Sequence, residues 1–470
     1  MTPSDLPPLD RAAAEPYYRQ IYHRFRSAIA SGVLKPGDRI PSARALTREL
    51  GLARGTIDAA YALLAAEGYV SARGQAGTIV TPGLEPRLPA AAALPASGAS
   101  AQPSHRPDSI LPFQMGLPAL DAFPRKIWAR LGARCVRAMQ PSDMTHPSVT
   151  GLPALRAGIA AYLHMSRGIA CSPSQVFVTS GYHHTMQLVC QALLRAGDRV
   201  WVEDPGYPLT RDLLRHLHID AVPVPVDAEG LVVAEALARA PDARASVVTP
   251  AHQSPLCVTL SLPRRLALLD WAAHNAAWII EDDYDGEYRY ASRPLPALKS
   301  IDQGGRVLYA GTFSKVLFPG LRLAYVVVPE AQVACFEQVA QAFAGSPQLT
   351  QAIVASFIAE GHFARHIQRM RKLYAQRRAA TIAGLERVLG DHVQIDSPPG
   401  GMHLILRLQA PQSDRLLAVR MREQGMYGGA LSDWSSSPEG AGALLLNFTN
   451  IDSQEVAEAL GRRIRALLET

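Results

Sequence analysis

Residues 311–322 read GTFSKVLFPGLR and follow directly on a short apolar run, Val307–Ala310. The run predicts a buried β-strand, and the Gly, Ser and Pro residues after it predict a turn at the end of that strand. Lys315 in this turn, with Arg322 close behind, is typical of a site where a lysine binds a cofactor covalently and an arginine binds its anionic group. Because a single lysine after a strand is more often an ordinary surface residue, the interpretation depends on supporting groups elsewhere in the chain.

The chain from Leu111 onward repeats this pattern of strand, turn and helix. Segments such as 183–195 and 263–275 space their apolar residues as a helix does. Between them stand short runs rich in β-branched residues, at Val176–Val178, Val200–Val202, Val247–Val248, Trp278–Ile280, Val307–Tyr309 and Tyr325–Val328. Continuous apolar strands that alternate with helices predict an α/β fold, in which a large and mostly parallel sheet is covered by helices on both faces.

Several polar residues stand where these predicted strands end, which is where ligands bind in open α/β sheets. Pyridoxal phosphate (PLP) requires a lysine for a Schiff base, a carboxylate at its pyridine nitrogen, a hydroxyl donor near its ring oxygen and several donors for its phosphate. The residues that match these needs are Lys315, Asp282, Tyr284, Thr312, Arg322, Gly181 with the amides of Tyr182 and His183 at a helix start, and Tyr207 as a stacking ring. Asp282 could instead cap a helix, and Tyr207 could be a core residue, but the order of the whole set favours a PLP site.

The first eighty residues follow a different pattern. Residues 16–32 carry one apolar stripe at helical spacing, which predicts a helix. A second helix is predicted from Ser42, a good N-cap residue, to Gly51, and a third from about Ala53. Two short β runs around a Gly-rich turn follow within residues 68–80. Together these elements predict a winged helix-turn-helix.

A helix-turn-helix presents the start of its second helix to the major groove of DNA. Arg54 stands there and is suited to donate to guanine or phosphate, Arg44 lies in the first turn of the preceding helix, and Arg73 lies at the wing tip. Taken singly, each arginine is as well explained as a solvated surface charge. Their joint placement favours a double-stranded DNA operator as the partner. The predicted DNA contacts are Ser42, Arg44, Arg54, Thr56, Arg73 and Thr78.

These patterns predict three parts: a winged-helix domain at residues 1–81, a Pro/Ala-rich linker at 82–110 and an effector domain at 111–470. A chain of 470 residues can form at least two cores, and its net charge of +6 permits an anionic partner without proving one.

The five cysteines are widely spaced and form no CxxC pair, which argues against a disulfide framework or a zinc site and fits a reducing cytoplasm. The N-terminus is acidic and proline-rich, unlike a signal peptide, and no uninterrupted apolar run is long enough for a membrane span. We therefore expect a cytoplasmic protein without a metal site or a membrane segment.

The N-terminal motifs resemble the winged helix of GntR-type regulators. They are Tyr18-Arg-Gln-Ile21, the stretch GVLKPGDRIPSAR at 32–44 and Ala66-Glu-Gly-Tyr69. Residues 111–470 resemble a fold-type I aminotransferase domain through Phe123-Pro124, Trp128, Arg156, Arg167-Gly168, EDDYD at 281–285, Ser314-Lys315 and PGLR at 319–322. Fused in this order, the two parts resemble the MocR/GabR-type regulators.

This resemblance implies a DNA-binding regulator whose aminotransferase-like domain consists of a large sheet domain and a small α+β C-terminal subdomain. It implies PLP on Lys315, with Asp282 at the pyridine nitrogen, Tyr284 at the ring hydroxyl, and Thr312 and Arg322 at the phosphate. It also implies a head-to-tail homodimer.

The chain departs from the family pattern at the position of the substrate carboxylate. An arginine near the C-terminus usually forms a bidentate charge pair with that carboxylate, and Leu445 stands at its position here. Ordinary transamination of α-amino acids is therefore not expected, and the arginines within 365–378 are expected to face solvent or DNA instead. The missing arginine favours PLP itself or an amine without a carboxylate as the effector.

Four smaller departures concern contacts around the two predicted sites. Ala53 replaces a small polar residue, which removes one phosphate contact. Tyr182-His183-His184 stands where glutamines are common, and adjacent histidines point to different helix faces, so altered phosphate or effector contacts are expected rather than a metal site. Cys257 replaces the glycine of a Pro-x-Gly turn and is expected to act as a small buried hydrophobe. Met144–Gly151 lacks the expected tyrosine and turn, which predicts the loss of a contact between subunits.

The leading hypothesis is a transcriptional regulator, not an enzyme, that senses PLP or an amine effector through the Lys315 aldimine. One alternative is an active PLP-dependent aminotransferase that carries a DNA-binding domain, and another is a DNA-binding protein with an inactive C-terminal domain. The intact wing and Arg54 favour the first hypothesis. Leu445 counts against the second, and the retained Lys315 and Asp282 count against the third.

Overall fold

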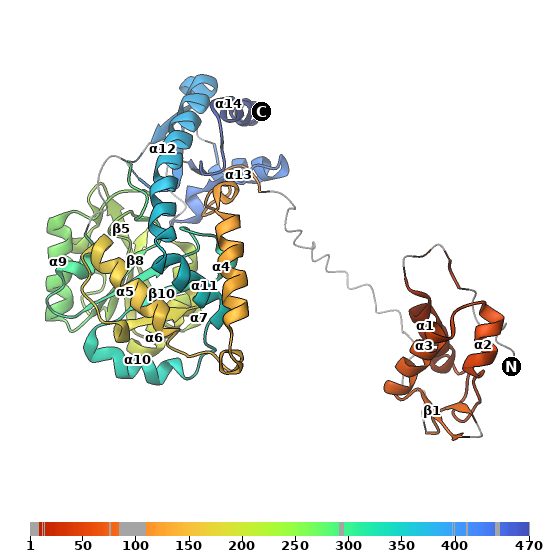
Figure 1. Cartoon of the computed structure of the whole chain (residues 1–470). Helices are drawn as coiled ribbons and strands as arrows, with labels where there is room; N and C mark the ends of the chain where they lie inside the picture. Colours follow the sequence, from red (N-terminus) through yellow and green to blue (C-terminus); the bar gives the residue numbers. More distant parts are fainter. Residues whose placement is uncertain are drawn as a thin grey trace. The chain divides into compact units, whose positions relative to one another are not determined.

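The computed structural model describes residues 9–11, 13, 15–74, 77–83, 110–290, 296–396, 398, 400–409, 412–437 and 442–469. The chain folds as two compact units, which divide between Arg106 and Pro107 (Figure 1). The predicted linker at 82–110 lies outside the described residues except for Pro82, Gly83 and Ile110. The domain boundaries taken from the sequence therefore stay predictions.

The described part of the N-terminal unit has the order of elements that the sequence predicts: α1 (Tyr17–Ala30), α2 (Ala43–Leu50), α3 (Arg54–Ala66), and an antiparallel pair, β1 (Val70–Ala72) and β2 (Thr78–Val80). The hydroxyl of Ser42 accepts a hydrogen bond from the Ala45 N–H at the start of α2, and Gly51 ends that helix in the left-handed conformation. Apolar residues from all three helices and from both strands form one core. The winged-helix prediction is confirmed.

The C-terminal unit is built on a large sheet in the order β3-β10-β9-β8-β7-β4-β5-β6. Its strands are β3 (Val176–Thr179), β4 (Arg199–Asp204), β5 (Asp220–Asp227), β6 (Gly230–Leu231), β7 (Ala245–Val248), β8 (Trp278–Asp283), β9 (Val307–Thr312) and β10 (Ala324–Val327). The central neighbours pair in parallel, whereas β10 runs antiparallel to both β3 and β9, and β6 pairs antiparallel with β5. All six predicted runs form strands, and the α/β fold is confirmed.

Helices cover both faces of this sheet (Figure 1). They are α4 (Arg125–Ala138), α5 (Pro153–Arg167), α6 (Tyr182–Leu193), α7 (Pro208–His216), α8 (Val233–Arg239), α9 (Leu262–His274), α10 (Val333–Ala340) and α11 (Gln348–Ala359). In β3, Val176 and Val178 pack in a core with residues of α5 and α11, whereas Phe177 between them packs with residues of α6 and α10. Successive side chains of a strand point to opposite faces, so both faces are buried.

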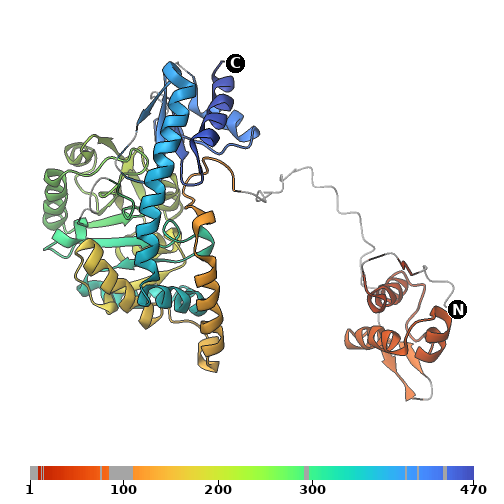
Figure 2. The same ribbon diagram turned by 45° about the horizontal axis from the view of Figure 1, so that its top comes forward.

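A smaller antiparallel sheet, in the order β11-β12-β14-β13, forms the C-terminal subdomain. Its elements are β11 (Val393–Asp396), β12 (His403–Leu408), α13 (Asp414–Glu423), β13 (Gly429–Ala430), β14 (Ala443–Asn447) and α14 (Gln454–Leu468). The long helix α12 (His362–Leu389) connects the two layers: Phe363 packs in the core of the large sheet and Leu385 in that of the small one (Figure 2). No helix in the described ranges combines the length and apolarity needed to cross a bilayer.

Candidate functional site

The candidate site is a cavity of about 400 Å³ at the carboxyl ends of the central strands. This volume is in the range of small-molecule sites. All nine residues that the sequence predicts for a cofactor site line it: Gly181, Tyr182, His183, Tyr207, Asp282, Tyr284, Thr312, Lys315 and Arg322. They come from the ends of β8 and β9, the turns after them, the start of α6 and the residue before α7. Because parallel strands end at one edge of the sheet, segments far apart in sequence meet there.

Lys315 is held by contact with a distant turn. Its Nζ donates a hydrogen bond to the backbone oxygen of Gly116 at 3.1 Å, and a Cβ on Gly116 would lie only 2.2 Å from that nitrogen. Burial lowers the pKa of the Lys315 amine, although the carboxylates of Asp285 and Asp282 oppose this shift. A lowered pKa favours the neutral amine, which is the nucleophilic form.

Asp282 presents a carboxylate to the cavity without a bonding partner in the described part of the chain. Burial raises the pKa of Asp282 to about 8, and the nearby carboxylates of Asp283 and Glu203 add to the effect. The Glu203 carboxylate accepts hydrogen bonds from the backbone and hydroxyl of Thr249 and from Gln253, while burial raises its pKa to about 7. A cationic N–H placed beside Asp282 would restore its ionised form.

An anion-binding corner lies at the start of α6. Gly181 has φ 111°, and a Cβ there would stand 3.4 Å from the Arg322 guanidinium carbon, so the guanidinium lies close over the first turn of the helix. No carboxylate among the described residues forms an ion pair with Arg322. An arginine without a counter-ion, next to the N–H groups of a helix start, is suited to a phosphate.

The two histidines after Tyr182 point in different directions, as expected. His183 lies at the cavity wall, whereas His184 turns away: its Nδ1 accepts a hydrogen bond from the Ser180 N–H, and its ring packs against Phe343. In the part of the chain that the structure describes, no group of three His, Cys, Asp or Glu side chains is placed to hold a metal ion.

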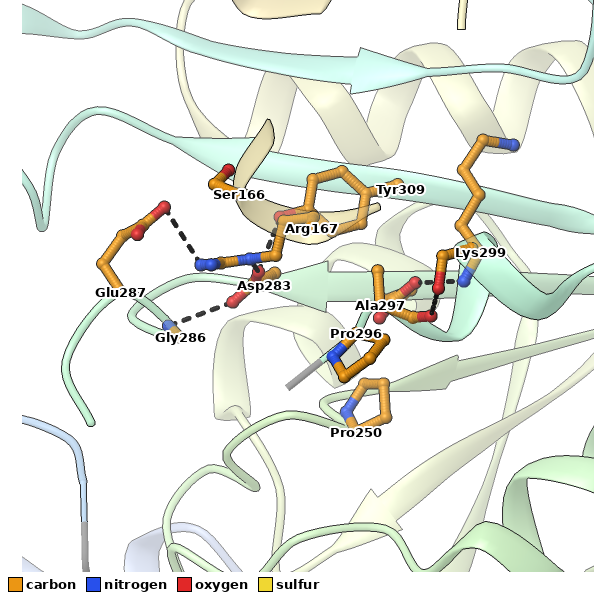
Figure 3. Close-up of polar contacts among 12 residues, drawn as sticks. Ser166, Arg167, Pro250, Asp283, Gly286, Glu287, Pro296, Ala297, Lys299 and Tyr309 are labelled. Atoms are coloured by element: carbon orange, nitrogen blue, oxygen red, sulfur yellow. Dashed lines mark hydrogen bonds and ion pairs between the residues drawn. The ribbon is translucent and has the colours of Figure 1, made fainter. Parts of the chain in front are cut away.

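The end of β8 is anchored from behind by a buried charge cluster (Figure 3). Arg167 contacts Asp283 at 2.6 Å and Glu287 at 3.0 Å, and the Tyr309 hydroxyl donates to Asp283 at 2.6 Å. Burial alone would raise the pKa of Asp283, but the Arg167 charge and the hydrogen bonds outweigh it and lower that pKa. Because neighbouring residues of a strand face opposite sides, fixing Asp283 orients Asp282 toward the cavity.

A second cluster, which the sequence analysis did not identify, lies beside Tyr284. Nδ1 of His252 stands 2.9 Å from Asp285 Oδ1 and 3.1 Å from Tyr284 Oη. Burial lowers the pKa of an imidazole, but the Asp285 carboxylate outweighs this and raises the pKa of His252 well above its usual value. The acidic run 281–285 was the only signal in the sequence, and it did not indicate a histidine partner from residue 252.

Cys257 belongs to the same cluster, which corrects its interpretation as a small buried hydrophobe. It is buried as expected, but its Sγ lies 3.3 Å from Nε2 of His403, a residue of the cavity wall. Burial alone would raise the pKa of the thiol, whereas the charges of His403 and His252 lower it to about 6. The thiol therefore forms a polar pair rather than an apolar contact.

The arginines of 365–378 were expected to face solvent or DNA, and this is wrong for the second half of the run. Arg371 contacts Glu287 at 3.3 Å, Arg377 is buried beside Asp121, and Arg378 lies over the ring of Tyr290. Arg365 and Arg369 are exposed. These side chains hold α12 against the rest of the unit, and none of them lines the cavity.

The end of the cavity near Leu445, where the family pattern has an arginine, is apolar. Leu445 is fully buried and clusters with Ile405, Ala443, Met115, Leu256, Leu431 and Trp434. Met115 and Trp434 line the cavity in front of it. Arg322 is the one arginine among the lining residues of the described chain.

In the N-terminal unit, the predicted DNA contacts lie at the start of α2, the start of α3 and the wing. Arg44, Arg54 and Arg73 are exposed, whereas Thr56 and Thr78 are half-buried. Ser42 is exposed, with its hydroxyl at the α2 cap. Ala53 precedes α3 without a side-chain cap, which leaves the first N–H groups of that helix available to a phosphate.

Comparisons with known proteins agree with this division. A model of the aminotransferase class I and II family matches residues 119–462, and one of the bacterial gntR family of regulatory proteins matches residues 17–80. The probable rhizopine catabolism regulatory protein MocR of Rhizobium meliloti is 37% identical over 98% of this chain and 95% of its own. The pyridoxine biosynthesis transcriptional regulator PdxR of Corynebacterium glutamicum is 33% identical over 92% of each. The structure of the alpha-aminoadipate aminotransferase LysN from Thermus thermophilus is 27% identical, with a TM-score of 0.69 over 77% of this chain and 92% of that one.

Proposed function

The chain belongs to the MocR-type transcriptional regulators, in which a GntR winged helix is joined to an aminotransferase class I and II domain, and we propose that this domain binds PLP on Lys315 as its sensing group. The chain is thus a DNA-binding regulator rather than an enzyme, and its curated relatives along the whole chain are named as regulators. The aminotransferase family is PLP-dependent, which supports the cofactor assignment.

One observation carries the proposal: three side chains that match the three functional groups of PLP share one cavity. They are the amine of Lys315, the unpartnered carboxylate of Asp282 and the unpaired guanidinium of Arg322. PLP has a carbonyl, a pyridine nitrogen and a phosphate, one for each of them. Gly181 supports the same conclusion, because any side chain there would fill the space beside the guanidinium.

In this proposal each residue has a distinct task. Asp282 holds the proton on the pyridine nitrogen, and Tyr284, oriented by His252, donates to the ring hydroxyl. Arg322, Thr312 and the first N–H groups of α6 bind the phosphate. Tyr207, which lines the same cavity, would stack on the ring. When bound, PLP supplies an aldehyde carbon that exchanges between amines.

The effector is either PLP itself or an amine that competes with Lys315 for it. The relative PdxR, named as a pyridoxine biosynthesis regulator, supports the first. The space beside the predicted cofactor residues, bounded by Met115, Met402 and Trp434, supports the second. The occupancy of this cavity by PLP or an amine is communicated to the winged helix, which binds the operator. The regulator acts as a head-to-tail homodimer in the cytoplasm.

Replacing Lys315 tests the proposal. We expect Lys315→Ala to keep its basal affinity for operator DNA and to lose the change in affinity that PLP causes in the wild type. Gel-shift titrations with and without PLP measure both. Lys372→Ala, a change at an exposed lysine of α12, is the matched control and keeps the response. Borohydride reduction followed by peptide mass spectrometry locates the trapped cofactor. An unchanged PLP response in Lys315→Ala refutes the proposal.

A further inference from the structure

Around Met115, Met402, His403 and Trp434, the described residues of the cavity wall include no lysine or arginine other than those assigned to the cofactor. Lys315 and Arg322 are the lysine and the arginine among the lining residues of the described chain, and the proposed cofactor engages both. The remaining candidates are histidines. Two of them line the cavity: His183, which lies at the start of α6 in the anion-binding corner, and His403, whose Nε2 lies 3.3 Å from the Cys257 thiol. His252 is not a lining residue and is paired with Asp285 at 2.9 Å.

Behind this wall the apolar side chain of Leu445 closes the space. Leu445 has no exposed surface, and the Met115 and Trp434 side chains pack against its cluster from the cavity side. A carboxylate pressed against this wall would give up its hydration without gaining a counter-ion. Burying an unpaired charge costs far more than burying an apolar group, so the wall disfavours an anion.

His403 adds one polar group to the wall, and its contacts fix the proton on one of its ring nitrogens. Nε2 lies 2.9 Å from the Pro255 carbonyl oxygen, which can only accept, so Nε2 carries a hydrogen. Nδ1 forms no hydrogen bond within the described residues. Burial lowers the pKa of His403, but the Cys257 thiol outweighs this and raises it, so the ring is favoured as an imidazolium that donates from Nδ1. The Cys257 thiolate, 3.3 Å from Nε2, balances that charge and leaves no uncompensated cation for a carboxylate.

We propose that the space between the cofactor residues and Leu445 is an effector subsite for a primary amine that lacks an α-carboxylate and places an uncharged group against Met115, His403 and Trp434. The inference rests on the proposed function, because it assumes PLP on Lys315. It goes beyond the proposed function because it excludes ordinary amino acids as effectors. It assigns this exclusion to Leu445 and His403 of the small subdomain and to Met115 in the segment before α4.

The test uses pairs of amines that differ only by the carboxylate: tyramine and tyrosine, phenethylamine and phenylalanine, ethanolamine and serine. Each is titrated into PLP-loaded full-length protein while the absorbance of the bound cofactor is followed. We expect at least one decarboxylated member to change the absorbance at a concentration about 10- to 100-fold lower than its parent amino acid, the range set by one missing charged hydrogen bond.

Leu445→Arg supplies the missing charge, and Leu445→Met is the volume-conserving control. We expect Leu445→Arg to narrow or reverse the preference for the decarboxylated amine over its parent amino acid, and Leu445→Met to keep that preference. Because a buried arginine can prevent folding, Met115→Arg places the charge directly at the cavity wall and serves as the second variant, with circular dichroism as the check on folding.

Two results overturn the inference. One is an amino acid that acts as well as its decarboxylated partner in the wild type, and the other is a bound cofactor whose absorbance no amine in any pair changes. Both differ from failure of the proposed function, in which wild-type protein shows no cofactor absorbance and no PLP trapped on Lys315. If cofactor binds but no amine acts, PLP itself remains the effector.

Discussion

Gly116→Ala is the substitution that most directly tests how Lys315 is positioned. A Cβ at residue 116 would stand 2.2 Å from the lysine Nζ, whereas non-bonded contacts begin at about 3.5 Å. The amine must therefore retreat by more than about 1 Å and give up its hydrogen bond to the Gly116 oxygen. In addition, φ at this residue is +73°, a left-handed conformation that costs an alanine about 1–2 kcal/mol.

Gly197→Ala separates the two effects. Gly197 has φ +88° but no atom within 4 Å of the position a Cβ would take, so it carries the backbone cost without the collision. We expect both variants to lose about 1–2 kcal/mol of unfolding free energy. Only Gly116→Ala is expected to bind PLP more weakly, by at least about tenfold or 1.4 kcal/mol.

Denaturant unfolding measures the stability loss, and titration of cofactor-free protein with PLP, followed by absorbance, measures affinity. Borohydride trapping reports whether the cofactor still reaches Lys315. Equal PLP affinity and equal trapping in Gly116→Ala and Gly197→Ala would refute the reasoning, because the lysine would then tolerate displacement from the Gly116 turn.

The remaining predictions concern the winged helix and the thiol. Arg54→Ala is expected to weaken operator binding by about 1–3 kcal/mol if Arg54 contacts a base, with exposed Arg137 of α4 as the control position; equal losses from both changes would contradict this. The Cys257 thiolate is expected to titrate near pH 6 in ultraviolet difference spectra against Cys257→Ser. His403→Gln removes a positive neighbour and is expected to raise that pKa toward its ordinary value, about 8.5. Burial raises the pKa of Cys190 to about 12, so it stays protonated in this range, and coincident midpoints for wild type and His403→Gln would overturn the assignment.

The positions of strands, helices and turns could be predicted because they depend on local patterns. Apolar runs such as Ile279–Ile280 and Tyr325–Val328 form strands because both faces of the sheet are covered, so every side chain in these two runs is buried. Ser42 and Gly51 mark the ends of α2 through their own backbone and side-chain chemistry. Motif order also predicted which residues would meet, because parallel strands bring their carboxyl ends to one edge.

The pairings within the site could not be read in the same way, because each joins segments that lie far apart in the chain. His252 and Asp285, which share a hydrogen bond, are 33 residues apart in the sequence, and Cys257 and His403, which share another, are 146 residues apart. The residues next to Cys257 in the sequence do not distinguish it from a cysteine that packs in an apolar core. Its lowered pKa comes from two imidazoles that only the folded chain brings beside it.

The sequence and the tertiary structure thus determine different features of this protein. The sequence alone determined the order of a winged helix and a PLP-type domain, the nine residues around one cavity and the absence of an arginine at Leu445. Only the tertiary structure decided that, among the described residues, Arg322 is the one arginine that lines the cavity, since Arg371, Arg377 and Arg378 are engaged elsewhere. The physical reason is that charge compensation in a buried site depends on distance and desolvation, which the three-dimensional packing sets and local sequence does not encode.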